Sequence, residues 1–279
     1  MGKIILVAEC GINHNGDLEL AKRLIKKSKD VGMDYVKFQK RTIDLVYSKE
    51  ELESYRESPW GTTFRQQKEG LEFNKEQYDE INRYCKEIGI PWFASPWDLE
   101  SINFLTQYNP PYIKVPSALV TYRKYLEAIA ETKIPVIMST GMSNKNQIDT
   151  AMDILGENLE ILLHTTATYP CKFSDLNLLK IRTLIKEYGH YYTIGYSNHS
   201  PSAIPILFAM ALGAEVIETH ITHDRSAYGS DQSSALEKRQ LETICEWRNE
   251  LKETLGNGKW KIFDSEIPVM KKLRKHYDF

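Results

Sequence analysis

Eight short apolar segments alternate with eight amphipathic segments along this chain, and this alternation limits the possible folds more than any other feature. The first apolar segment, residues 3–9, is rich in β-branched residues, which is typical of a strand buried on both faces of a parallel sheet. Asp17 follows as a suitable helix N-cap, and apolar residues then recur at helical spacing up to Gly32. The expected strands are 3–9, 35–40, 91–95, 112–117, 135–140, 159–165, 192–197 and 216–222, and the expected helices are 17–32, 74–88, 98–108, 122–132, 144–155, 176–188, 202–212 and 236–255.

This pattern predicts an α/β protein with a single (β/α)8 barrel, a TIM barrel, because eight strand–helix units in about 255 residues match its size. A doubly wound open sheet is the alternative, but it seldom uses eight equal units, and the residues after the first strand do not fit GxGxxG. We expect a catalytic barrel domain over residues 1–258 and a short C-terminal tail, 259–279, packed on the barrel. The longest interruption, residues 41–73, follows the second strand on the side where barrel loops build active sites.

Composition excludes several classes of function. The chain has 36 Lys and Arg against 38 Asp and Glu, a net charge of −2, which argues against a nucleic-acid partner. No apolar run approaches the roughly 20 residues needed to cross a membrane, and a strand pattern begins at once, so no signal peptide is expected. The four cysteines are widely spaced and form no CxxC pair, which favours a reduced, cytoplasmic protein.

Polar residues collect at the carboxyl ends of the expected strands, where barrels carry their active sites. Lys37 and Lys114 are the most informative, because each lies within an apolar strand and a buried ammonium group needs an anion. That anion could be Glu9 or Glu218 in an internal salt bridge. We favour an anionic ligand with phosphate or carboxylate groups, since two lysines lie beside four serines. The strand-end residues are Glu9, Lys37, Gln39, Ser95, Lys114, Ser117, Ser139, His164, Ser197, His199 and His220.

His199 and His220 end the seventh and eighth expected strands, which are neighbours in a closed barrel. Two imidazoles on adjacent strands can share a divalent metal and leave positions open for water and substrate. His223, on the following loop, could replace either of them. A thiol nucleophile at Cys10 or Cys171 is a weaker hypothesis, because buried and inert cysteines are common.

Four aromatic residues near the same strand ends are candidates to line a sugar site: Trp60, Trp92, Trp97 and Tyr169. Trp92 falls within an expected strand and is better explained as a core residue. Trp60 and Tyr169 lie in expected loops, which makes them the stronger candidates.

The segments that carry these residues resemble the sialic acid (N-acetylneuraminate) synthase family. The resemblance runs from residue 4 to residue 258, in order and with the family's spacing, and covers the catalytic barrel only. Synthases of the eight-carbon acid KDO and of the shikimate pathway differ in their opening and phosphate-binding motifs. The matching segments are 8–16 (AECGINHNG), 36–39 (VKFQ), 94–96 (ASP), 113–117 (IKVPS), 139–142 (STGM), 169–170 (YP), 195–200 (GYSNHS), 218–220 (ETH) and Asp231.

The resemblance implies a metal-dependent condensation of phosphoenolpyruvate (PEP) with an open-chain aldose, in a pathway that makes a surface polysaccharide or glycan. Carbon 3 of PEP attacks the aldehyde, water adds at carbon 2, and phosphate leaves. The resemblance also implies a homodimer and a divalent metal, Mn²⁺ with Mg²⁺ or Co²⁺ as alternatives. It implies catalytic roles for Glu9, His199 and His220, metal binding by the two histidines, PEP binding by Lys37, Ser95, Lys114, Ser117, Ser139 and Ser197, and sugar binding by Gln39, Tyr169 and Asp231.

The sequence departs from the family's pattern at positions where the resemblance implies contact with the acceptor sugar. Leu119 stands where the family has a glutamate, Ala167 where it has an asparagine, and Ser230 and Gln232 replace the Pro and His that flank Asp231. The family's C-terminal antifreeze-like domain, which supplies an arginine to the partner's substrate, has no counterpart in the given residues. We therefore expect the acceptor, an amino sugar or a phosphorylated sugar, to differ from simple N-acetylmannosamine.

Two other functions stay open at this point. A metal-dependent pyruvate aldolase would use the same histidines, but bare pyruvate gives little reason for two lysines and four serines. A non-catalytic barrel that binds a phosphorylated sugar is the second. Phosphate release from PEP separates the synthase from both.

Overall fold

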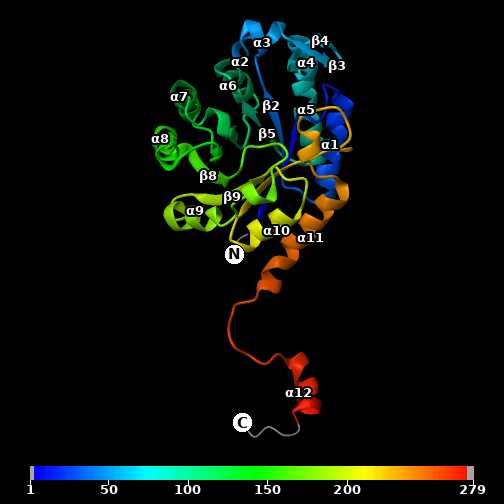
Figure 1. The fold of residues 1–279 in the computed structure, drawn as a ribbon, viewed down its shortest axis with the longest axis vertical. Coiled ribbons are helices and arrows are strands. Elements are labelled where there is room, and N and C mark those ends of the chain that lie inside the picture. The colour runs from blue at the N-terminus through cyan, green and yellow to red at the C-terminus, as the bar shows by residue number, and fades with distance from the viewer. Residues whose placement is uncertain (1–2, 275–279) are drawn as a thin grey trace.

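A closed barrel of eight parallel strands forms the centre of the computed structural model, which describes residues 3–274 (Figure 1). The barrel order β1-β10-β9-β8-β7-β6-β5-β2 joins the first strand to the last and to the second. This confirms the predicted (β/α)8 fold. The barrel strands are β1 (Ile5–Gly11), β2 (Tyr35–Lys40), β5 (Trp92–Pro96), β6 (Ile113–Val115), β7 (Val136–Ser139), β8 (Leu159–His164), β9 (Thr193–Asn198) and β10 (Val216–His220).

The helices that follow the strands surround the barrel and lie where the sequence predicts them. Asp17 caps the first helix by accepting hydrogen bonds from the backbone N–H groups of Glu19 and Leu20, and Gly32 ends that helix with φ of 96°. The main helices are α1 (Leu18–Val31), α5 (Lys75–Ile88), α6 (Leu99–Thr106), α7 (Arg123–Glu131), α8 (Lys145–Leu155), α9 (Lys180–Tyr188), α10 (Ile204–Ala211) and α11 (Lys238–Leu255).

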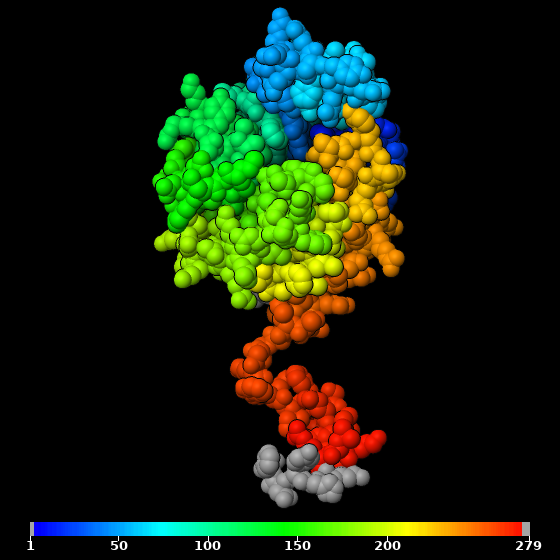
Figure 2. Space-filling view, viewed as in Figure 1, coloured from blue at the N-terminus to red at the C-terminus, as the bar shows by residue number. Residues whose placement is uncertain are grey.

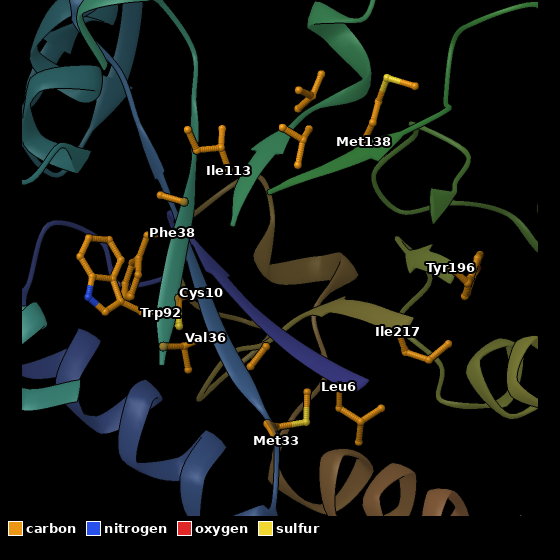
Figure 3. Packing of buried hydrophobic residues seen from close by; sticks show 14 of the residues in the cluster. Leu6, Cys10, Met33, Val36, Phe38, Trp92, Ile113, Met138, Tyr196 and Ile217 are labelled. Carbon is orange, nitrogen blue, oxygen red and sulfur yellow. The ribbon is translucent and has the colours of Figure 1, made fainter. Parts of the chain in front are cut away.

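The alternation of side chains along each strand separates two cores. Outward-facing residues such as Val36 and Phe38 pack against the helices in the larger apolar cluster, which also contains Cys10 (Figure 3). Inward-facing residues such as Val7 and Phe93 fill the barrel interior in a smaller cluster. Farther along the same strands the inward positions turn polar, so the apolar core ends where the site begins.

Residues 41–73 form a small cap at the end of the molecule opposite the C-terminal tail (Figure 1). The sequence analysis identifies this segment only as the longest interruption of the strand–helix alternation and predicts no helices or strands within it. It contains two short helices, α2 (Ile43–Val46) and α3 (Lys49–Glu53), the antiparallel hairpin of β3 (Tyr55–Ser58) and β4 (Gly61–Thr63), and the helix α4 (Phe64–Leu71).

The C-terminal tail extends away from the barrel, so the predicted packing of residues 259–279 on the barrel is wrong for the part that the structure describes (Figure 2). Residues 256–266 form an exposed link to the short helix α12 (Ile267–Leu273), and Trp260 is fully exposed. Positive φ angles at Gly256 and Gly258 turn the chain just after α11, which leaves the tail's apolar side chains in solvent. Residues 1–2 of the expected barrel domain and 275–279 of the tail lie outside the described residues. Within residues 3–274, no helix has the length and apolar character to cross a membrane.

Candidate active site

A cavity of about 140 Å³ opens among the carboxyl-terminal ends of the barrel strands. The predicted strand-end residues line it, apart from His164, and so does the loop residue Tyr169. The strand alternation explains this result: Lys37 and Gln39 of β2 point inward, while Val36 and Phe38 point to the helices. The predicted residues in the lining are Glu9, Lys37, Gln39, Ser95, Lys114, Ser117, Ser139, Tyr169, Ser197, His199 and His220.

Two lysines and two glutamates form a buried charged cluster at the base of the cavity. Lys37 Nζ lies 2.9 Å from Glu218 Oε2 and 3.3 Å from Glu9 Oε2. Lys114 Nζ lies 2.7 Å from Ser139 Oγ and 3.7 Å from Glu218 Oε1. The internal salt bridge that we considered from sequence, with Glu9 or Glu218, is therefore present, and Glu218 is its centre because it contacts both lysines.

The cluster shifts the pKa values of its two carboxyl groups in opposite directions. Burial alone would raise the pKa of Glu218, but Lys114 and Lys37 outweigh it and lower that pKa to about 2. Burial would likewise lower the pKa of Lys37, but the two carboxylates raise it. In Glu9 burial dominates over the attraction of Lys37 and raises the pKa. Glu9 is thus the carboxyl group best suited to take up and release a proton.

A chain of hydrogen bonds fixes the side of the cavity next to Glu9. Gln39 Nε2 donates to Glu9 Oε1 at 2.9 Å, and the guanidinium group of Arg41 donates to Gln39 Oε1 at 2.6 Å. A Cβ at Gly11 would lie 3.1 Å from Glu9 Oε1, 3.2 Å from Gln39 Nε2 and 3.4 Å from Asp231 Oδ2, so a glycine keeps this corner open. We did not predict Arg41 as a site residue, although its position two residues after Gln39 continues the alternation of Lys37 and Gln39.

His199 and His220 lie side by side in the cavity wall, with ring centroids 5.5 Å apart. His199 Nδ1 lies 2.8 Å from the carbonyl oxygen of Thr166, which orients the ring and leaves Nε2 directed at Tyr169. Such a second contact is typical of metal-binding histidines. Within the described part of the chain, His220 Nδ1 is buried without a hydrogen-bond partner. These features fit a site that gives a metal two imidazole nitrogens.

In the part of the chain that the structure describes, the histidine pair has no third protein ligand of the usual kind. Among residues 3–274, no group of three or more His, Cys, Asp or Glu side chains is arranged to hold a metal. Asp231 Oδ2 is 3.7 Å from His220 Nδ1. A metal at this pair would therefore keep positions for water and substrate, as a catalytic metal requires.

Tyr169 covers the histidine pair from the cavity side. Its ring stacks on His199 at a centroid distance of 4.1 Å, and its hydroxyl oxygen lies 3.0 Å from His199 Nε2. It therefore contacts the nitrogen that a metal would need. Of the other aromatic candidates, Trp97 lines the cavity and Trp92 packs in the core as expected. Trp60 belongs to the cap formed by residues 41–73, called the insert below, and packs on Tyr228 of the loop after β10.

Several polar residues that the sequence singled out lie elsewhere. His164 is buried, with Nε2 2.7 Å from the carbonyl oxygen of Leu176, and His223 is exposed in a groove beside α1 and α5. Cys10 and Cys171 are buried, and burial raises the pKa of Cys10 far above its ordinary value. His223 is therefore not positioned to replace either cavity histidine, and the thiol hypothesis has no support in the geometry.

The fold and the site together define a class of protein: a barrel enzyme that can bind an anionic substrate beside a two-histidine metal site. Comparison with known sequences narrows this class. The NeuB family matches residues 24–260. The chain is 35% identical to human N-acetylneuraminate-9-phosphate synthase over 278 residues, which covers 97% of this chain and 76% of the human protein. It is 32% identical to N,N'-diacetyllegionaminic acid synthase of Legionella pneumophila over 280 residues, with 97% and 78% of the two chains covered.

Comparison with solved structures shows the same relationship. The crystal structure of N-acetylneuraminic acid synthetase from Leptospira borgpetersenii, in complex with citrate, matches with a TM-score of 0.83 and 30% identity over 98% of this chain and 93% of that one. The chain belongs to the NeuB family. It is accordingly a transferase that forms a carbon–carbon bond from PEP and a sugar with the help of a metal, in carbohydrate biosynthesis.

Proposed function

We propose that this cavity condenses PEP with the open-chain form of an aldose, and that the residues predicted from sequence perform the steps. One observation carries the assignment: two buried lysines and four serines surround a single cavity whose wall also holds a histidine pair. Lys37 and Lys114 would bind the carboxylate and phosphate of PEP, with hydroxyl donors from Ser95, Ser117, Ser139 and Ser197. Bare pyruvate lacks the phosphate group that such a set suits, so the aldolase alternative is less well supported.

The charged cluster suggests how PEP would be accommodated. Glu218 is shared by both lysines, since it lies 2.9 Å from Lys37 and 3.7 Å from Lys114, and Glu9 is the second carboxyl group beside Lys37, at 3.3 Å. PEP would take over part of these contacts, while the hydrogen bond from Ser197 Oγ to Glu218 Oε1, at 2.9 Å, keeps the carboxylate in place. The buried lysines therefore stay compensated in both states.

The acceptor would lie between the histidine pair and the Gln39 side of the cavity. A divalent metal held by His199 and His220, Mn²⁺ with Mg²⁺ or Co²⁺ as alternatives, would polarise the acceptor aldehyde when bound. Glu9 would hold and transfer a proton as carbon 3 of PEP attacks and water adds at carbon 2. Gln39, Tyr169 and Asp231 would hold the sugar hydroxyls, and Gln39 also holds Glu9 in place through its 2.9 Å hydrogen bond.

The residues expected near the acceptor sugar favour an acceptor other than N-acetylmannosamine. Ala167 lines the cavity with a methyl group where the family has an amide, and Leu119 packs against the apolar core. Neither residue offers the polar contact that an amino sugar would receive in the family. The acceptor must therefore be held by other groups in this chain.

Metal-stripped protein tests the proposal directly. We expect phosphate release from PEP only when Mn²⁺ or a similar ion is returned, and only with one or a few aldoses from a panel of free and phosphorylated sugars. Phosphate measured over time reports both the metal requirement and the acceptor. Failure to bind PEP at all, measured by calorimetry, would favour the non-catalytic barrel.

We expect PEP binding to weaken above pH 8 because of Lys114. Burial lowers the pKa of Lys114 to about 8, although Glu218 opposes the shift. Its ammonium form predominates below that pH and is lost above it, so the KM for PEP should rise with pH, approaching about tenfold per pH unit for one proton. Lys114→Arg keeps its charge and should remove this rise. A KM unchanged up to pH 9.5 in the wild type would contradict the assignment of Lys114.

We also propose that the protein is a cytoplasmic homodimer. Four free and buried cysteines fit a reducing compartment. Ile204 and Phe208 of α10 expose 54% and 56% of their surfaces, and such apolar residues often lie at interfaces between subunits.

A further inference from the structure

Two cations, Arg41 and Lys68, lie together beside the active-site cavity without enough carboxylates to neutralise them. Arg41 directly follows β2, and Lys68 belongs to α4 of the insert. The side chain of Arg41 is 10% exposed. Lys68 Nζ lies 4.7 Å from the ring centroid of Phe64 and 5.3 Å from that of Tyr47. We call Arg41 and Lys68 the rim cations.

Two carboxylates, Asp231 and Glu72, act electrostatically on Lys68, but neither forms an ion pair with it within 4.0 Å. Asp231 lies 3.7 Å from His220 instead, and the other carboxylates of this region are engaged by other cations. Glu72 is shared by Lys40, at 3.2 Å, and by Arg41 at the long distance of 3.8 Å. Asp44 and Glu69 of the same insert both pair with Arg65, at 2.6 and 3.2 Å.

Both rim cations have N–H donors that are free to bind an anion. Within residues 3–274, Lys68 forms no ion pair within 4.0 Å, and Arg41 Nε is buried without a hydrogen-bond partner. Burial and the nearby positive charge of Arg41 lower the pKa of Lys68 to about 8. Two cations that repel each other in a partly buried place are stabilised by an anion.

The rim cations adjoin the sugar side of the cavity. Arg41 donates to Gln39 at 2.6 Å and its guanidinium carbon lies 4.2 Å above the ring of Trp97, and both Gln39 and Trp97 line the cavity. His199, where the aldehyde would bind together with His220, directly follows β9, and His220 ends β10. Gln39 lies in β2 and Arg41 directly follows that strand. A sugar held at the histidines by its aldehyde would direct its other end toward Gln39.

We propose that the acceptor sugar carries an anionic group, a phosphate ester or a carboxylate, at the end remote from its aldehyde, and that Arg41 and Lys68 bind it. This inference rests on the proposed synthase function. The planar guanidinium group suits the paired oxygens of phosphate and carboxylate, and the ammonium adds a second charged donor. The rim cations thus replace the contacts that Leu119 and Ala167 do not provide, and they select the substrate class.

The test compares three acceptors that differ only at the remote carbon: N-acetylmannosamine, its 6-phosphate and the corresponding uronic acid. Wild-type protein, Lys68→Met, Arg41→Gln and Lys49→Met are assayed for phosphate release from PEP. Lys49 is the matched control, because it lies in the same insert with a side chain 86% exposed. For Lys68→Met we expect the KM of an anionic acceptor to rise about 10- to 100-fold, as for loss of a charged hydrogen bond. The KM of PEP and turnover of the neutral sugar should change less than about threefold.

The outcomes separate the inference from the function on which it rests. A preference for the phosphate or the uronic acid identifies the anion. Equal use of all three sugars, or equal effects of Lys68→Met on all three, overturns the inference and leaves the synthase in place. If none of these three sugars supports release, PEP binding is measured by calorimetry, and only its absence counts against the synthase assignment. Calorimetric titration of the 6-phosphate into wild type and Lys68→Met then decides whether the rim cations bind a sugar anion.

Discussion

Replacing His199 with alanine is expected to abolish metal-dependent phosphate release. The cavity offers two imidazoles and no further cluster of metal ligands among the described residues. This change therefore removes one of the two protein ligands that would bind the metal. A metal that polarises a carbonyl contributes several kcal/mol to the transition state, so turnover should fall by about 10²- to 10³-fold or more. The rate is measured as phosphate release at saturating PEP and Mn²⁺, and His220→Ala should behave alike.

A matched control is available in the neighbouring loop. His223 is exposed outside the cavity, so His223→Ala should retain the wild-type rate and metal requirement. Because His199 is buried, His199→Asn and a thermal melt are needed to show that the loss of rate is not a loss of fold. A folded His199→Asn protein with wild-type metal-dependent turnover would disprove the histidine site.

Replacing Lys37 with methionine is expected to abolish PEP binding and to destabilise the protein. Lys37 is 4% exposed and lies between Glu9 and Glu218, so its loss leaves two buried carboxyl groups without their shared cation. Breaking a buried ion pair in this way costs about 3–5 kcal/mol. Calorimetry measures PEP binding, and urea denaturation measures the free energy of unfolding.

A second substitution separates the two effects. Glu218→Gln in the Lys37→Met background removes one uncompensated charge and should restore part of the stability without restoring PEP binding. If Lys37→Met instead bound PEP with wild-type affinity, Lys37 would have a structural role only. Recovery of PEP binding in the double variant would lead to the same conclusion.

Much of the site is predictable because strands in a closed barrel alternate strictly. Once residues 35–40 are identified as a strand, Lys37 and Gln39 must share a face, and the apolar neighbours Val36 and Phe38 identify that face as the inner one. The same reasoning extended by two residues would have found Arg41. His164 shows the limit of this approach, because it ends a strand as predicted yet contacts the carbonyl oxygen of Leu176 outside the cavity.

The sequence by itself determined the number of strand–helix units, their order and the polar residues at the strand ends, because these depend on local periodicity and on helix caps such as Asp17. Only the tertiary structure decided which charges meet. Glu218 joins Lys37 and Lys114 across different strands, and Arg41 and Lys68 come together through the folding of the insert. It also decided the course of the tail, which extends into solvent where the sequence suggested packing. Such contacts depend on how distant segments pack, and no local pattern encodes that packing.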